Sequence, residues 1–144
     1  MVTVIAGLKG HGKTKQLISL CNSASGKSSG AVVCIERGQK LKYDINHGAR
    51  LIDTIPYDIR SYQVLRGFIT GLYAGNYDIS EIFIDSLYKV SGNSDSQECE
   101  KFLHWCDTFG AENGVNFTIT ISVGDEDITE GMRKYMTAAP NAEC

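Results

Sequence analysis

A short segment rich in glycine, residues 7–14, constrains the fold of this 144-residue chain more than any other part of the sequence. The apolar residues at 2–6 predict a buried strand before it, and apolar residues recur at helical spacing within 15–21 after it. A strand, a tight loop and a helix are therefore expected in that order. This arrangement is typical of α/β proteins, in which loops at the carboxyl ends of parallel strands form the ligand crevice.

The segment 7–14, GLKGHGKT, matches the phosphate-binding pattern G-x-x-x-x-G-K-[ST] at every fixed position. Glycines let the backbone wrap phosphate oxygens with its N–H groups pointing inward, at φ values that a Cβ would forbid. Lys13 is expected to reach the β- and γ-phosphates, beside the positive end of the helix that follows. The predicted nucleotide-binding residues are Gly7, Leu8, Lys9, Gly10, His11, Gly12, Lys13, Thr14 and Lys15. A glycine-rich turn with a solvated lysine is the alternative.

An acidic residue, Asp85, follows the apolar run 82–84 at the end of a predicted strand. Such a carboxylate can hold Mg²⁺ through water, opposite the hydroxyl of Thr14. Taken alone, the pattern also fits an aspartate that caps a helix. In combination with the loop at 7–14, it predicts a Mg²⁺ site formed by Thr14 and Asp85.

Glu36 is the candidate catalytic residue, because it follows the apolar run 31–35 and is delivered to the same crevice by a different strand. Ser86 stands directly after Asp85, where many ATPases carry a glutamate. A surface salt bridge is the alternative for Glu36. Ser122, at the tip of the last predicted strand, is expected either to contact the γ-phosphate or to form a local hydrogen bond.

The remaining sequence alternates predicted strands with predicted helices. The strands are at 31–35, 79–85 and 116–123, and the helices follow the N-cap Ser61 and occupy 96–109 and 128–136. We expect a three-layer α/β fold with a parallel sheet and helices on both faces. Residues 1–136 are predicted to form a single nucleotide-binding domain, and 137–144 a flexible tail.

Two segments are expected to interrupt this alternation. Residues 40–45 alternate polar and apolar side chains and can pair with 50–54, which predicts a small β-hairpin as a candidate recognition surface. Residues 23–30 are small and polar and predict a loop. Gly26, Lys27 and Ser28 within that loop look like the end of a second phosphate loop, but the required earlier glycine is Cys21.

Charge and composition exclude several classes of protein. The formal net charge of −3 supplies no general field for a nucleic acid backbone, so nucleic acid is an unlikely partner. No apolar run approaches the roughly 20 residues that span a bilayer, and a signal peptide is not evident. We therefore expect a cytoplasmic protein without a membrane span.

The chain has five cysteines, an odd number that favours reduced thiols over a disulfide framework. Cys99, His104 and Cys106 suggest a metal site, but no second ligand cluster accompanies them. A helix whose stripe of Cys99, Leu103 and Cys106 packs on the core is the preferred interpretation.

Residues 2–20, together with 81–86, resemble the P-loop NTPase superfamily. The whole chain resembles small uncharacterised bacterial ATP-binding P-loop proteins that are sometimes labelled twitching-motility-like. This resemblance implies Mg²⁺ and ATP as cofactors. The position of Glu36 resembles that of the carboxylate in the RecA-like branch of these enzymes. ATP is expected rather than GTP, because the chain contains no N-K-x-D guanine-reading segment.

The leading functional hypothesis is a Mg²⁺-dependent ATP-binding protein with slow ATPase activity. A small-molecule kinase is one alternative, in which Arg133 or Lys134 stabilises the transferring phosphoryl group. The other is a nucleotide-gated interaction module, which binds ATP to order a loop and presents a surface to an unidentified protein partner.

Overall fold

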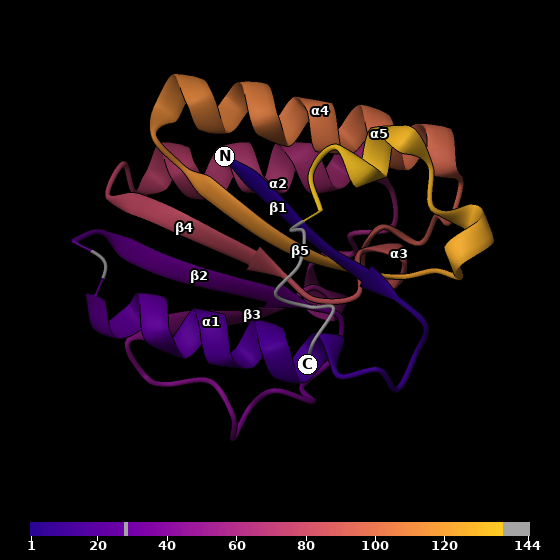
Figure 1. Ribbon diagram of the computed structural model, residues 1–144. Coiled ribbons are helices and arrows are strands. Elements are labelled where there is room, and N and C mark those ends of the chain that lie inside the picture. Colours follow the sequence, from indigo (N-terminus) through magenta and orange to yellow (C-terminus); the bar gives the residue numbers. More distant parts are fainter. Residues whose placement is uncertain (28, 137–144) are drawn as a thin grey trace.

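All strands of the protein lie in one parallel sheet, described here from a computed structural model that covers residues 1–27 and 29–136. The strands are β1 (Val2–Gly7), β2 (Ala31–Glu36), β3 (Ala49–Asp53), β4 (Ile79–Ile84) and β5 (Asn116–Ser122). Their order across the sheet is β1-β5-β4-β2-β3, and every neighbouring pair is parallel. Their carboxyl ends therefore meet at one edge (Figure 1).

Helices cover both faces of this sheet, which confirms the α/β class and the layered arrangement. They are α1 (Lys13–Lys27), α2 (Tyr62–Gly75), α3 (Leu87–Ser91), α4 (Ser96–Asn113) and α5 (Glu130–Arg133), with 3-10 turns η1 (Ile55–Tyr57) and η2 (Asp125–Asp127). Figure 1 shows α1 below the sheet, and α2 and α4 above it. The predicted helix at 128–136 is shorter than expected.

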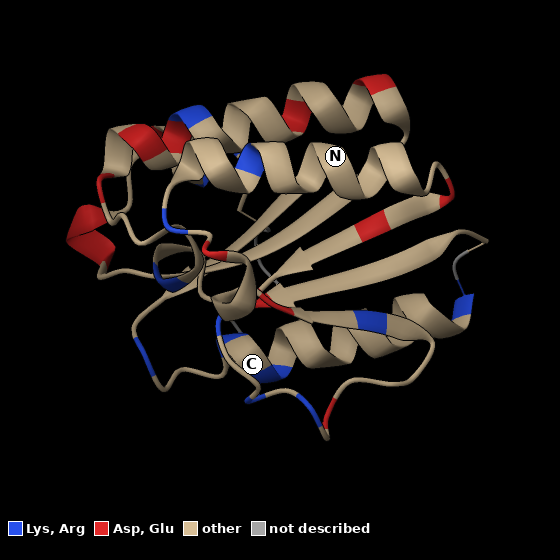
Figure 2. Cartoon of the chain, turned by 180° about the vertical axis from the view of Figure 1, so that it is seen from behind, with Lys and Arg blue, Asp and Glu red and all other residues tan. Residues whose placement is uncertain are grey.

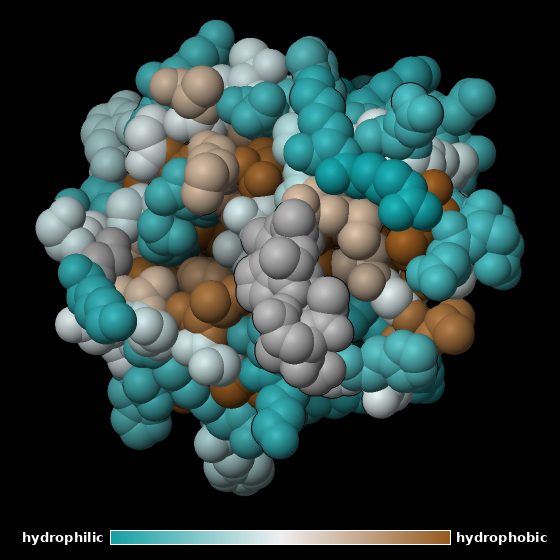
Figure 3. Space-filling model, viewed as in Figure 1, coloured by the Kyte–Doolittle hydropathy of each residue, from teal (hydrophilic) through white to brown (hydrophobic). Residues whose placement is uncertain are grey.

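Two hydrophobic cores separate the three layers. The smaller core joins Leu17 and Cys21 of α1 to one face of the central strands. The larger core packs α2 and α4 on the other face and contains Phe102 and Phe117, both fully buried. In the view of Figure 3, hydrophilic residues cover much of the surface and hydrophobic residues lie in the hollows between them. Burial on both faces explains why residues 31–35 of β2 and the second half of β4, residues 82–84, are continuous apolar runs.

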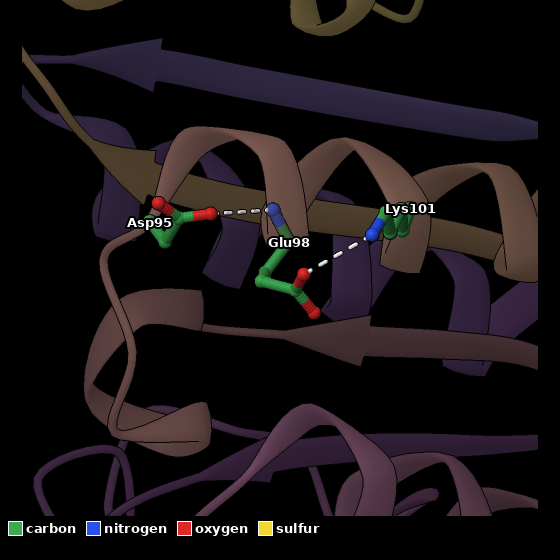
Figure 4. Close-up of polar contacts among 3 residues, drawn as sticks. All are labelled: Asp95, Glu98 and Lys101. Carbon is green, nitrogen blue, oxygen red and sulfur yellow. Dashed lines mark hydrogen bonds and ion pairs between the residues drawn. The ribbon is translucent and has the colours of Figure 1, made fainter.

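Side chains fix the starts of the two long helices on the larger core. The Ser61 Oγ accepts a hydrogen bond from the N–H of Val64 at 3.0 Å, which confirms the predicted N-cap of α2. Asp95 caps α4 by accepting from the N–H of Glu98 at 2.9 Å, and Glu98 pairs with Lys101 at 3.3 Å (Figure 4). These caps direct the apolar face of each helix onto the sheet.

The predicted stripe of α4 is confirmed, because Cys99, Leu103 and Cys106 are all fully buried in the larger core. The side chains of Cys21 and Cys34 are buried in the smaller core, and the thiols of all four of these cysteines are free. Among the described residues, no group of three or more His, Cys, Asp or Glu side chains is arranged to hold a metal ion.

The predicted β-hairpin is wrong. Residues 41–44 form turns, and 49–53 join β2 as a parallel edge strand, with Glu36 level with Asp53. The reason lies in Leu41 and Ile45, which both enter the smaller core, while Tyr43 between them is 90% exposed. A spacing of four buries both residues in a helical turn, and the N–H of Ile45 donates to the carbonyl of Leu41 at 3.1 Å.

The predicted loop at 23–30 is wrong in extent, because α1 continues through Lys27. The hydroxyl of Ser25 donates to the carbonyl of Asn22 at 2.9 Å, so this polar side chain finds its partner within the helix. Gly26 and Lys27 therefore end a helix. They lie at the opposite end of α1 from the segment 7–14, where they cannot form a second phosphate loop beside the first.

The chain returns to β1 at its described end. The N–H of Val4 donates to the carbonyl of Tyr135 at 2.8 Å, and Met136 forms a parallel bridge with Val4. The predicted tail, 137–144, lies outside the described residues. Within residues 1–27 and 29–136, none of the helices has the length and apolar character needed to cross a bilayer.

Candidate functional site

A pocket of about 410 Å³ lies at the edge where the strands end, between the loop after β1 and the ends of β2 and β4. Its lining brings together segments far apart in the sequence. The lining residues are Lys9, Gly10, Gly12, Lys13, Thr14, Lys15, Glu36, Arg37, Lys40, Leu41, Asp85, Ser86, Lys89 and Ser122. Six of the predicted loop residues, together with Glu36 and Asp85, are thus found around one cavity.

The loop exposes unpaired backbone donors. Gly10 and Gly12 have φ values of 87° and 80°, in the left-handed region where a side chain is strained. Within the described residues, no hydrogen bond engages the N–H groups of Gly10, Gly12 and Lys13. The loop therefore presents N–H groups at the start of α1, which is suitable chemistry for an anion.

Lys13 is held inside the loop. Its side-chain Nζ donates to the carbonyl of Leu8 at 2.7 Å, and the same oxygen accepts from the N–H of His11 at 3.3 Å. Burial lowers the pKa of the Lys13 ammonium, and the negative charge of Asp85 acts in the opposite direction. The ammonium is thus fixed at the pocket wall within the field of one carboxylate.

Asp85 is the centre of a hydrogen-bonded cluster and is only 8% exposed. The hydroxyl of Thr14 donates to it, with distances of 3.1 and 3.3 Å to the two carboxylate oxygens. The hydroxyl of Thr120 donates to the Oδ1 of Asp85 at 2.8 Å, and accepts from the N–H of Ser86 at 2.7 Å. The backbone of Ser86 is left-handed, at φ 60°, so the chain bends sharply directly after Asp85.

Thr120 is a site residue that sequence reasoning missed. It lies on β5, the strand between β1 and β4, and is 1% exposed. A hydroxyl buried in the strand 116–122 needs a hydrogen-bond partner, and the sequence could have indicated this need. Only the strand order identifies Asp85 as that partner.

The donor set of Thr14 and Asp85 fits Mg²⁺ and does not fit an all-protein metal cage. A hydroxyl and a carboxylate are hard oxygen ligands, and their contact places them together on one side of the pocket. Mg²⁺ usually takes one or two protein ligands and fills its octahedron with water and phosphate oxygens. A metal that arrives with a polyphosphate therefore suits these residues.

Glu36 lies on the pocket wall next to Asp85 in the sheet, since the N–H of Asp85 donates to the carbonyl of Ile35 at 2.9 Å. Its side chain is 3% exposed, and its Oε2 accepts from the N–H of Leu41 at 3.1 Å. Burial raises the pKa of Glu36, against hydrogen bonds from the backbone of Leu41 and Lys40. A buried carboxylate of raised pKa is a stronger proton acceptor than an exposed one.

Basic side chains surround these two acids. Figure 2 shows acidic positions where the central strands end, and basic positions on the loops around them. Arg37 and Lys40 follow β2, and Lys89 comes from α3. Lys40 is the main reason why the pKa of Lys89 is lowered. This cluster was not predictable, because nothing in the sequence relates residue 89 to residues 37–40.

Other predicted residues lie outside this pocket. Leu8 lines a neighbouring hollow of about 650 Å³, while Gly7 ends β1 and His11 is exposed. Arg133 and Lys134 do not line the pocket, and Lys134 instead lies over the ring of Tyr135, at 5.4 Å. The kinase hypothesis therefore cannot rest on these two residues. Ser122 does line the pocket, level with Gly7 in the sheet.

No protein-family model matches this sequence, and no curated protein matches it either. Conclusions about function therefore depend on the residues of the chain itself.

Proposed function

We propose that this protein is a P-loop nucleoside triphosphatase that binds Mg-ATP in the pocket at the ends of β1, β2 and β4. The observation that carries the proposal is the contact between Thr14 and Asp85, 71 positions apart in the chain, directly beside the lysine of the loop. The motif alone predicts phosphate binding by residues 7–15. The contact adds oxygen ligands for the metal at the place where a terminal phosphate is expected.

Each part of the pocket has a separate role in this proposal. The N–H groups of the loop and the start of α1 receive the phosphate oxygens, and the ammonium of Lys13 neutralises the β- and γ-phosphates. Thr14 and Asp85 hold Mg²⁺, which supplies charge neutralisation when bound, and Thr120 keeps the carboxylate of Asp85 oriented. We infer ATP rather than GTP from the lack of an N-K-x-D segment in the sequence.

Hydrolysis is assigned to Glu36, which orients or deprotonates the attacking water. The support is its burial on the pocket wall next to Asp85 and its raised pKa. Its carboxylate lines the pocket, and its Oε2 accepts from the N–H of Leu41. Because that hydrogen bond draws the side chain toward residue 41, we expect slow turnover in the isolated protein.

The basic side chains at the mouth favour a second candidate, a small-molecule kinase. Arg37, Lys40 and Lys89 stand at the pocket where a phosphoryl acceptor would enter. This arrangement replaces the predicted lid of Arg133 or Lys134. Phosphate release from ATP in the absence of any acceptor favours the ATPase, whereas turnover that requires an added acceptor favours the kinase.

The direct test is calorimetric titration of the purified protein with ATP, ADP and GTP, with and without Mg²⁺. We expect ATP and ADP to bind with Mg²⁺ and Lys13→Ala to weaken both. If the wild-type protein and Lys13→Ala bind ATP equally, the loop does not hold phosphate and the proposal fails.

A further inference from the structure

Three cations form a cluster that the proposed nucleotide site does not require. Arg37, Lys40 and Lys89, here called the basic rim, come from the segment after β2 and from α3. All three line the nucleotide pocket, and all three also line a second, shallow pocket of about 430 Å³ beside it. The basic rim is therefore the boundary between two adjoining hollows.

The second pocket has its own chemistry. Apart from the basic rim, it is lined by Ile55, Tyr88, Gly92, Asn93 and Ser94. The aromatic ring and the aliphatic side chain offer an apolar wall, and the amide and hydroxyl offer polar contacts. A small molecule with a compact anionic group and a short organic part matches this lining.

The basic rim lacks acidic partners. In residues 1–27 and 29–136, the ion pairs are Arg60 with Asp58 and Lys101 with Glu98, both away from the pocket. Two of the rim's cations, Lys40 and Lys89, line the same pockets, and Lys40 is the main cause of the lowered pKa of Lys89. An anion placed between these like charges removes their repulsion and gains charge-assisted hydrogen bonds.

We propose that the basic rim is a second anion-binding subsite, which holds a small phosphate-bearing molecule beside the terminal phosphate of the bound nucleotide. This inference rests on the proposed function only for its geometry relative to ATP. The subsite is distinct from the loop, because its cations come from the segment after β2 and from α3.

The surrounding charges favour a small ligand over a nucleic acid. The hollow that shares Tyr88 and Ser94 with the second pocket has two acids in its lining, Asp95 and Asp127, and one cation, Lys9. The turn η2 carries three consecutive acids and stands out as an acidic segment in Figure 2. A polyanion that extends past the basic rim in this direction meets negative charge, whereas a single phosphate group does not.

The test is calorimetric titration of inorganic phosphate, and separately of glycerol 3-phosphate, into protein saturated with Mg-AMP-PNP. The analogue keeps the loop and the γ-phosphate position occupied. We expect one equivalent of phosphate to bind. We expect Lys40→Ala and Lys89→Ala each to weaken that binding at least about tenfold, and AMP-PNP binding by less than about threefold.

Lys42→Ala is the matched control, since Lys42 is exposed on the same segment as Lys40 and lines neither pocket. It should leave phosphate affinity unchanged. Tighter binding of glycerol 3-phosphate than of phosphate identifies an organic phosphate as the ligand class, and equal binding identifies free phosphate.

Two results overturn the subsite. One is that phosphate does not bind the AMP-PNP complex. The other is that Lys40→Ala and Lys89→Ala weaken the binding of AMP-PNP but not that of ADP. This result would assign the basic rim to the γ-phosphate itself. Failure of AMP-PNP to bind contradicts the proposed function instead. In that case, phosphate is titrated into the nucleotide-free Lys13→Ala variant. Adding Lys89→Ala to this variant must still abolish phosphate binding, whereas adding Lys42→Ala must not.

Discussion

The two walls of the proposed nucleotide pocket differ in the chemical groups that form them. The loop wall, residues 8–15, consists mainly of backbone N–H groups and one buried ammonium. The strand-end wall consists of Glu36 and Asp85, both buried and both fixed by hydrogen bonds from residues elsewhere in the fold. Backbone N–H donors can bind a polyanion regardless of its organic part. Carboxylates held in fixed positions can instead bind a metal ion and orient a water molecule. We therefore expect that substitutions can disrupt the proposed binding and the proposed turnover separately.

The largest effect is expected on the loop wall. Lys13→Ala removes the ammonium that faces the phosphates and should weaken ATP binding about 100-fold, because hydrogen bonds to charged groups contribute roughly 1.5–3 kcal/mol. Calorimetry measures the change, and circular dichroism checks the fold. Lys27→Ala, at the far end of the same helix, is the control and should bind as the wild type does. Equal losses in both variants would show that the general charge of α1, and not the loop, holds the nucleotide.

The next effect tests the metal side of the strand-end wall. Asp85→Asn should reduce ATP affinity about tenfold with Mg²⁺ and leave affinity in EDTA nearly unchanged, because the lost charge faces the metal. Titrations in the two buffers measure the difference. Glu81→Gln, earlier on the same strand and bonded to Asn116, is the control. If Asp85→Asn retains the full enhancement by Mg²⁺, Asp85 is a structural residue.

Glu36→Gln separates turnover from binding. The amide oxygen can still accept from the N–H of Leu41, but it cannot take a proton, so turnover should fall at least roughly tenfold with ATP affinity retained. Steady-state phosphate release measures this. Asp53→Asn, level with Glu36 on the neighbouring strand, is the control.

The raised pKa of Glu36 also sets the sign of the pH dependence. A protonated carboxyl cannot act as a base, so wild-type turnover should fall as the pH decreases through this raised pKa. The corresponding limb should be lost in Glu36→Gln. A pH profile identical in the two proteins would exclude Glu36 as the base.

The smallest effect concerns the support of Asp85. Thr120→Val removes the hydroxyl that donates to Asp85 and accepts from Ser86, so the enhancement by Mg²⁺ should fall about threefold. It should also cost about 1–3 kcal/mol of stability, measured by urea denaturation. Thr118→Val on the same strand is the control. An unchanged enhancement by Mg²⁺ would limit Thr120 to a structural role.

The loop wall was predictable from the sequence, because the glycines, the lysine and the following helix are adjacent in the chain. Gly12, a fixed glycine of the motif, has a positive φ, and so does Gly10, which stands at a variable position of the motif. The strand-end wall was predictable only in part. Glu36 and Asp85 each follow an apolar run, but the role of Thr120 depends on β5 lying between β1 and β4.

Local sequence patterns also misled where the spacing of apolar residues fitted both a strand and a helical turn. Leu41 and Ile45 satisfy the alternation of a strand and equally the four-residue spacing of a helical turn, and packing under α1 decided for the turn. The basic rim shows the same limit. Lys40 and Lys89 line the same pocket only because β2 and β4 are neighbours, which no local pattern encodes.

The hydrogen bond from Lys13 to the carbonyl of Leu8 affects both the entropy cost of the proposed phosphate binding and the range of residues that position 8 can accept. An ammonium has three donors, so it can keep this bond while it receives phosphate oxygens. Much of the conformational entropy of a long side chain, up to about 2 kcal/mol, is then lost on folding and not on binding. The partner is a backbone oxygen, and the side chain of Leu8 is 53% exposed. Position 8 can therefore accept almost any residue without weakening the hold on Lys13.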